Sequence, residues 1–373
     1  MVVPQGGRDL AAAVGALLVI TAAGSLIGTI IVPRPIGSWL TRWVDRLVNG
    51  TFRLLTGPIG SYKRRDRVLA AQAPAILLIQ LIAWLAIFFI GYSLLLWPFL
   101  SAGITTAFTT AGPALWEIGS EQIHGAAVRT ILDMASLTGI VTITLQIAYL
   151  PTLYSAFNRR ETEVALLNAR AGVPSWGPEL LARTHFALGS GSSTIDTLPA
   201  LYENWERFAA DIAESHTTYL PLVRFRSPRA LSSWVISLLA VLDSAALYLT
   251  ASPDAAPTVP ARLCLRGGFE CLREIASAMN LKVPYPPDPA QGITLTYEEF
   301  LEGIATLRKV HFPIERDPEL AWPEFVGWRV NYEAAAYALA AAIDVVPALW
   351  SGPRRGRQAA IAPFRPAAGR PPK

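Results

Sequence analysis

Four polar side chains recur at helical spacing in a segment that is otherwise apolar. Thr138, Thr142, Gln146 and Tyr149 are separated by four, four and three residues, which places them on one face of a helix. Residues 134–158 contain no Asp, Glu, Lys or Arg. In a bilayer such a polar face packs against another helix or lines a water-filled path, and the sequence leaves both interpretations open.

A second set of candidate residues follows the longest uncharged run of the chain. Residues 68–116 carry no formal charge, and the run ends at Glu117, Ile118, Gly119 and Ser120. A carboxylate in this position is either a solvated loop residue or a charge at the mouth of a pore. At a mouth it would raise the local concentration of cations.

Three segments are long and apolar enough to hold these residues in a membrane. About 20 apolar residues cross a hydrocarbon core roughly 30 Å thick, and we expect spans at about 10–32, 74–97 and 134–154. The first has too long an apolar part and too little preceding positive charge for a signal peptide, so we expect an uncleaved helix. Pro151 removes a backbone donor near the end of the third span and is a candidate hinge.

Two further segments complete the predicted membrane region, residues 1–158. Apolar and basic residues alternate at helical spacing over about 36–55, which predicts an amphipathic helix in the membrane interface. Residues 101–120 are rich in Thr, Ala and Gly and have the length of a short re-entrant helix with a returning loop. An ordinary extracellular loop is the alternative, since irregular backbone at membrane depth needs a buried or cavity-lining position.

Composition and charge agree with a membrane protein. The chain is 52% hydrophobic and 16% charged, against about 25% charged in soluble domains. The loop at 33–67 carries eight basic and two acidic residues, and the tail at 351–373 carries six basic residues and no acidic one. Short basic loops stay in the cytoplasm, so we expect a multi-pass inner-membrane protein with its N-terminus outside. Basic segments that flank spans indicate a membrane surface rather than a nucleic acid.

Residues 159–350 are predicted to form a cytoplasmic domain made only of helices, because strand signals are nearly absent. Residues 234–250 are apolar, but Asp243 divides them, so we expect a buried core helix there; a fourth span is the alternative. We also expect a separate short helix at 161–171 and one long Ala-rich helix at 322–350. The tail at 351–373, rich in Pro, Gly and Arg, is predicted to be disordered.

The sequence predicts no catalytic, cofactor or metal site. Cys264 and Cys271 would lie about 10 Å apart on a helix, too far for a disulfide. The Gly/Ser run at 189–193 lacks the following Lys of a phosphate-binding loop and fits a linker. Charged residues at 203–216 fit a solvated helix face. The four histidines have no metal-ligand spacing: His124, His185, His216 and His311. We therefore expect neither an enzyme nor a bound cofactor.

Several stretches of the chain resemble a known group of proteins. They are Ala148-Tyr-Leu-Pro-Thr-Leu-Tyr-Ser-Ala-Phe-Asn-Arg-Arg-Glu161, Leu166-Leu-Asn-Ala-Arg-Ala-Gly172, Ser227-Pro228, Ala240-Val-Leu-Asp243 and Gly327-Trp-Arg-Val-Asn-Tyr332. The chain is similar here to a bacterial family of largely uncharacterised membrane proteins, some labelled two-pore-domain potassium-channel-like. The resemblance implies an ion-channel pore module, with a Thr-Leu-Gly-Phe-like filter signature at residues 117–120. Gly119 matches it and Ile118 is a conservative replacement, so the filter is degenerate.

The sequence thus predicts a three-helix membrane region attached to an all-helical cytoplasmic domain. We expect a homo-oligomeric pore protein for monovalent cations, with potassium as the ion that the resemblance implies. The competing interpretation is a non-conducting membrane scaffold or sensor whose helical domain binds a partner. The two interpretations differ in whether residues 104–120 enter the membrane.

Overall fold

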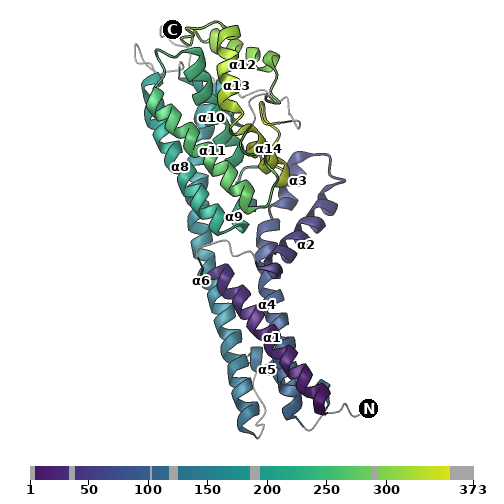
Figure 1. Cartoon of the computed structure of the whole chain (residues 1–373). Coiled ribbons are helices and arrows are strands. Elements are labelled where there is room, and N and C mark those ends of the chain that lie inside the picture. Colours follow the sequence, from purple (N-terminus) through teal and green to yellow (C-terminus); the bar gives the residue numbers. More distant parts are fainter. Residues whose placement is uncertain are drawn as a thin grey trace, which may run out of the picture. The chain divides into compact units, whose positions relative to one another are not determined.

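The structure is a computed structural model, and it describes residues 5–32, 38–100, 103–116, 125–184, 194–287 and 292–352. Every regular element in these residues is a helix, as predicted (Figure 1). The chain divides into two units. We call Met1–Gly60 with Val68–Ser155 the membrane unit, and Ser61–Arg67 with Ala156–Lys373 the helical domain.

The helices of the membrane unit follow the predicted spans closely. They are α1 (Gln5–Ile30), α2 (Trp39–Thr56), α4 (Gln72–Leu96), the short 3-10 helix η1 (Trp97–Phe99), α5 (Ile104–Trp116) and the first part of α6 (Ala126–Ala171). The expected spans at 10–32, 74–97 and 134–154 coincide with α1, α4 and part of α6. The predicted interfacial helix at 36–55 corresponds to α2, although residues 33–37 lie outside the described part.

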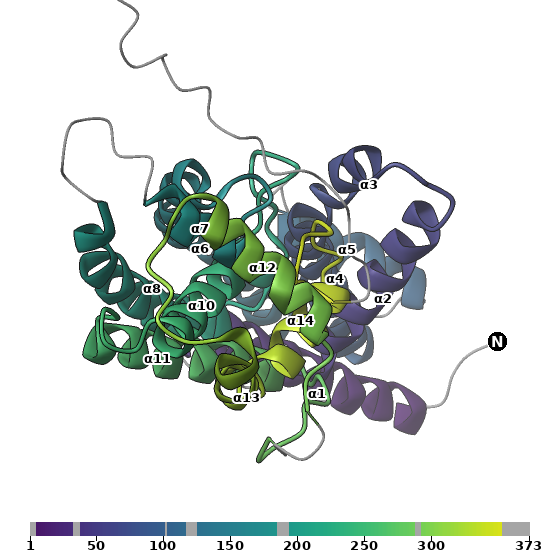
Figure 2. The same ribbon diagram turned by 90° about the horizontal axis from the view of Figure 1, so that it is seen from above.

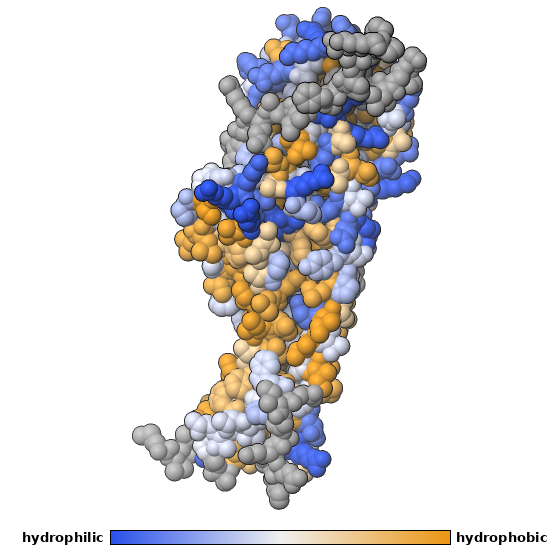
Figure 3. Space-filling model, turned by 180° about the vertical axis from the view of Figure 1, so that it is seen from behind, coloured by the Kyte–Doolittle hydropathy of each residue, from blue (hydrophilic) through white to orange (hydrophobic). Residues whose placement is uncertain are grey.

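The surface of the membrane unit suits contact with lipid. Each candidate span has one most apolar stretch, and little of it is buried: 22% in α1, 39% in Tyr62–Phe99 and 28% in α6. Large apolar side chains such as Leu17 and Leu137, both 61% exposed, cover these helices, and hydrophobic colour dominates this part of the surface in Figure 3. Water would disfavour so much exposed apolar area. The chain is therefore a membrane protein.

Helices α1 and α4 run antiparallel, and they pack closely because each has a glycine at the crossing. A Cβ on Gly15 would lie 2.5 Å from the carbonyl oxygen of Gly91, and one on Gly91 would lie 3.1 Å from that of Gly15. Small residues allow such close approach between membrane helices. Further along, the indole of Trp84 donates to the Ser25 hydroxyl at 3.0 Å.

The helical domain is built from nine further helices and a short 3-10 turn in the described residues. They are α3 (Tyr62–Leu69), whose first six residues belong to it, α7 (Gly177–Arg183), η2 (Thr194–Thr197), α8 (Leu198–Thr218), α9 (Pro221–Arg224), α10 (Trp234–Ala251), α11 (Thr258–Ala278), α12 (Tyr297–Lys309), α13 (Pro318–Arg329) and α14 (Glu333–Ala342). The end of α6 completes it.

Helix α10 is the centre of this domain. It is apolar and long enough to be a fourth candidate span, yet its whole length is buried. Helices α7, α8, α11, α13 and α14 pack around it (Figure 2). A helix with no surface left for lipid is a core helix, as predicted. Cys264 and Cys271 of α11 are buried free thiols in this core.

Two predicted helix boundaries were wrong. The break expected before residue 161 does not occur, because α6 continues from Ala126 to Ala171 without a Gly or Pro after Pro151 to stop it. The single helix expected at 322–350 is instead α13 and α14, separated by a turn at residues 330–332. Asp344, with φ 50°, then lies just after α14, in the left-handed region typical of helix ends.

Candidate functional site

Helix α5 is the structured part of the segment predicted at 101–120. It has 13 residues, about 20 Å at 1.5 Å per residue, which is too short to cross a membrane. Its small residues Ala107 and Ala111 are fully buried, and Phe108 packs edge-to-face on Phe89 of α4 at 5.3 Å. This face of α5 therefore lies against α4.

The last turn of α5 lies against α6. The Ser136 hydroxyl donates to the carbonyl oxygen of Ala114 at 2.8 Å and so satisfies one of the carbonyls that a helix end leaves open. A Cβ on Gly139 would lie 2.1 Å from the Leu115 carbonyl oxygen. Ser136 and Gly139 both fall within the predicted span at 134–154. A short helix thus packs between two long ones, at residues that belong to their apolar segments.

The polar face predicted on α6 is turned inward within the chain. Thr142 is fully buried, and Gln146 and Tyr149 are each 6% exposed. The Thr138 hydroxyl lies 2.7 Å from the hydroxyl of Tyr92 on α4. At Thr138 the structure therefore favours helix packing over pore lining.

Of the remaining predicted site residues, the structure describes Pro151 but not the four residues after α5. Four predicted residues directly follow the last residue of α5 in sequence and lie outside the described part of the chain: Glu117, Ile118, Gly119 and Ser120. Pro151 lies inside α6, which is helical on both sides of it. Because proline has no amide hydrogen, the carbonyl of Ile147 lacks its usual helical donor there.

A cluster of charges joins α3 to the rest of the helical domain. The Arg226 guanidinium donates to Asp66 at 2.9 Å and to the Tyr62 hydroxyl at 3.0 Å. It also donates to the carbonyl oxygens of Ile343 and Asp344 at 2.6 and 2.9 Å. Arg65 pairs with the Asp344 carboxylate. We call these residues the α3 junction; α4 begins three residues after α3 ends.

A buried arginine holds α6 in the same domain. Arg160 is fully buried and donates to the carbonyl oxygens of Leu222 and Phe225 at 2.8 and 2.7 Å. Its Nη1 lies 3.0 Å from Nε2 of His216. A guanidinium only donates, so Nε2 is the acceptor and Nδ1 of this histidine carries the proton. Burial first, and then the charge of Arg160, hold the pKa of His216 well below its ordinary value of 6.5.

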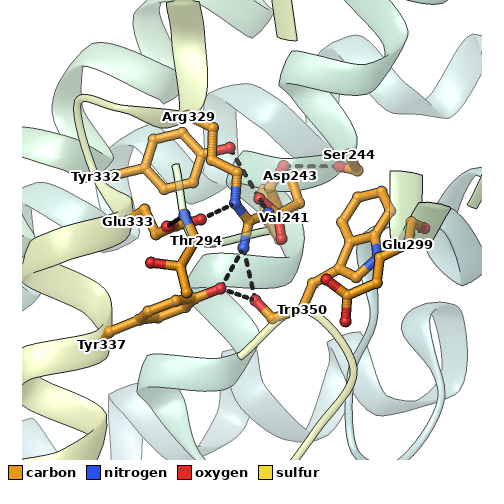
Figure 4. A network of polar contacts seen from close by, with 10 residues as sticks. All are labelled: Val241, Asp243, Ser244, Thr294, Glu299, Arg329, Tyr332, Glu333, Tyr337 and Trp350. Atoms are coloured by element: carbon orange, nitrogen blue, oxygen red, sulfur yellow. Dashed lines mark hydrogen bonds and ion pairs between the residues drawn. The ribbon is translucent and has the colours of Figure 1, made fainter. Parts of the chain in front are cut away.

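The largest polar network lies around Arg329, in the core next to α10 (Figure 4). Arg329 is fully buried and pairs with Asp243 and with Glu333, the latter at 2.7 Å. It also donates to the Trp350 carbonyl oxygen at 2.6 Å, and Tyr332 donates to Asp243 at 2.8 Å. Burial raises the pKa of Asp243 to about 6, although Arg329 lowers it. Every charge here has a partner, as a buried charge requires, so the network is a structural core.

The domain also has a hollow of about 480 Å³ between α11, the segment at 283–287 and α14. Arg273 lies over the ring of Tyr285 at its rim, 4.5 Å from the ring centre, and Tyr337 forms part of its wall. Among the described residues there is no group of three or more His, Cys, Asp or Glu side chains that would hold a metal ion.

Arg160, His216 and Arg226 were not predicted as site residues. Arg160 directly follows another arginine, Arg159, and this pair gives no sign of a buried side chain. His216 belongs to the segment 203–216, which was predicted to be a solvated helix face. A local signal did exist for His216, because it continues the apolar series of Trp205, Ala209 and Ile212 on α8.

Comparison with known proteins identifies no relative of this chain. No protein-family model, curated protein or solved structure matches the chain.

Proposed function

We propose that this membrane protein is an ion-channel-like pore for cations, with potassium as the first ion to test. The observation that carries the proposal is α5, which is too short to cross a membrane and packs on both α4 and α6 at residues of their apolar segments. A short helix at this depth is tolerated only when it is buried in protein or borders a water-filled cavity. The proposed pore forms where several copies of the chain bring their α5 helices together.

Membership of the two-pore-domain potassium-channel-like family is part of the same proposal. In that arrangement the residues after α5, Glu117 to Ser120, form the narrow mouth, and Glu117 supplies a ring of negative charge. The Glu117→Gln variant then lowers cation flux, and high salt reduces the difference because it screens an exposed charge. Glu121, four residues further on, is the control position.

The helical domain is proposed to lie in the cytoplasm and to control the pore. Two of its contacts support this. The α3 junction holds the segment that leads into α4, and Arg160 holds the continuation of α6. These are the two helices that bracket α5 in sequence. These contacts can therefore transmit a movement within the domain to both α4 and α6.

Cation flux from purified protein in liposomes tests the proposal. Gly139→Ala inserts a methyl group against the Leu115 carbonyl, so α5 must shift and flux should fall at least tenfold. The matched control is Gly24→Ala, a helical glycine of α1 whose Cβ would meet nothing within 4 Å. If Gly139→Ala conducts like the wild type, α5 is not the pore element. If folded wild-type protein passes no cations, the pore proposal fails.

That last outcome would favour a scaffold or sensor instead. The hollow next to α11 and α14 supports this second candidate, since its wall combines aromatic and apolar side chains with polar ones such as Arg273 and Asn331. Chemical-shift or fluorescence changes confined to Tyr285 and Tyr337 on addition of a partner would identify it.

A further inference from the structure

Helix α2 carries four different faces, and two of them are exposed. The face toward α4 is buried and consists of Leu40, Val44 and Val48. Next to it around the helix are polar residues, then a row of exposed arginines, and then a row of exposed apolar residues. The arginine row is Arg42, Arg46 and Arg53, and the apolar row is Trp39, Trp43, Leu47 and Leu54.

Two points along α2 are bonded to membrane helices. Ser38 caps its first turn, and the Ser38 hydroxyl lies 2.7 Å from that of Ser25 on α1. Just past the middle of the helix, the Asn49 side chain accepts a hydrogen bond from Gln72, the first residue of α4, at 2.8 Å. The helix therefore lies beside the end of α1 and the start of α4, at one edge of the membrane unit.

The apolar row is too exposed for water and belongs in lipid. Trp39 and Trp43 are 57% and 50% exposed, and Leu54 is 81% exposed. Tryptophan prefers the boundary between acyl chains and headgroups. With this row inserted in the acyl layer, the neighbouring arginine row lies at the level of the headgroup phosphates, where a guanidinium binds a phosphate group with two hydrogen bonds.

We propose that α2 is a binding surface for anionic phospholipids, with Arg42, Arg46 and Arg53 as the headgroup-binding residues. The ligand is a lipid of the leaflet on that side. The apolar row complements its acyl chain, and the arginine row complements its negative headgroup. This inference does not depend on ion conduction. Since α2 is bonded to α1 and α4, bound lipid also stabilises the membrane unit.

The test uses full-length protein in a neutral detergent, with phosphatidylglycerol and phosphatidylcholine as probes. Native mass spectrometry counts the lipids retained, and thermal unfolding measures the stabilisation. Wild-type protein should retain phosphatidylglycerol in preference to phosphatidylcholine and should gain thermal stability from it. In R42Q/R46Q/R53Q the apparent affinity for phosphatidylglycerol should fall on the order of 100-fold, because each basic residue at an anionic surface contributes about 1 kcal/mol.

The matched control is R170Q/R262Q/R308Q, which removes three exposed arginines of the helical domain. It should bind phosphatidylglycerol like the wild type. W39A/W43A should weaken retention of both lipids, because it removes the acyl-facing rings and no charge. Equal binding of both lipids by the wild type, or unchanged binding by the arginine variant, overturns the proposal. So does a smaller oligomer in W39A/W43A with unchanged lipid binding, since that result assigns the apolar row to a second copy of the chain.

Discussion

At the scale of single residues, the burial of His216 beside Arg160 makes folding sensitive to pH. Below its ordinary pKa of 6.5 the histidine takes up a proton in the unfolded chain, but the folded chain keeps it neutral. The stability that this site contributes is therefore present above pH 6.5 and is lost progressively as the pH falls below that value. The loss approaches about 1.4 kcal/mol per pH unit until the folded pKa is reached.

We expect His216→Gln to flatten the pH dependence of unfolding between pH 7 and 5, because glutamine still offers an oxygen to Arg160 and does not titrate. Thermal unfolding of the detergent-solubilised protein across this range measures the effect. His311→Asn is the control, since His311 is exposed and asparagine tolerates its left-handed backbone. An unchanged pH slope in His216→Gln would mean that His216 does not stay neutral in the folded chain.

The sequence was informative about single residues only where a regular pattern existed. Helical spacing places four polar residues on one face of α6: Thr142, Gln146 and Tyr149 are buried there, and Thr138 contacts Tyr92. Arg226 gave no such signal, because its partners are backbone carbonyls and distant side chains. Arg160 pairs with its neighbour Glu161, but the carbonyls that hold it in the core belong to the distant residues Leu222 and Phe225. Contacts of this kind depend on how the helices pack.

At the scale of elements, the α3 junction should control the mobility of the segment before α4. Arg226 satisfies two side chains of α3 and two carbonyls beyond α14. Arg226→Gln leaves the buried carboxylate of Asp66 without its main cation. Hydrogen bonds to charged groups contribute about 1.5–3 kcal/mol, so local opening of α3 should become roughly 10- to 100-fold more frequent.

Hydrogen exchange of peptides covering residues 61–69 measures that opening. Arg229→Gln is the control, because Arg229 is exposed nearby and should leave the exchange of α3 unchanged. Identical exchange in Arg226→Gln and the wild type would show that the junction does not hold α3, and the proposed control of the pore by the helical domain would lose one of its two routes.

The sequence predicted helices well where the length and periodicity of an apolar segment determine them. It predicted the ends of helices less well. The position of α5 in sequence and the burial of α10 followed from apolar patterns and from Asp243. The division between α13 and α14 did not, because residues 322–350 look helical throughout. After the turn, the Glu333 carboxylate accepts a hydrogen bond from the distant amide of Thr294, a tertiary contact that local propensity does not contain.

At the scale of the whole molecule, the boundaries between the two units fall at the charged positions of the sequence. Residues 61–67 belong to the helical domain and contain four of the basic residues in the first loop. The chain returns to this domain at Ala156, three residues before Arg159. Positive charge thus marks the edge of the membrane unit each time, which supports the cytoplasmic placement proposed for the helical domain.

Thiol labelling in intact cells tests that placement. Cys264 and Cys271 are buried, so the native background should be low, and cysteines can be introduced at three exposed positions, Arg53, Gly103 and Glu302. Three crossings with a cytoplasmic basic loop predict that an impermeant maleimide labels Gly103→Cys in intact cells. It should label the other two variants only after the cells are opened. Labelling of Arg53→Cys in place of Gly103→Cys would reverse the orientation. Labelling of Gly103→Cys together with Glu302→Cys would require a further crossing after α6, and α10 would then have to leave the core in which its side chains are buried.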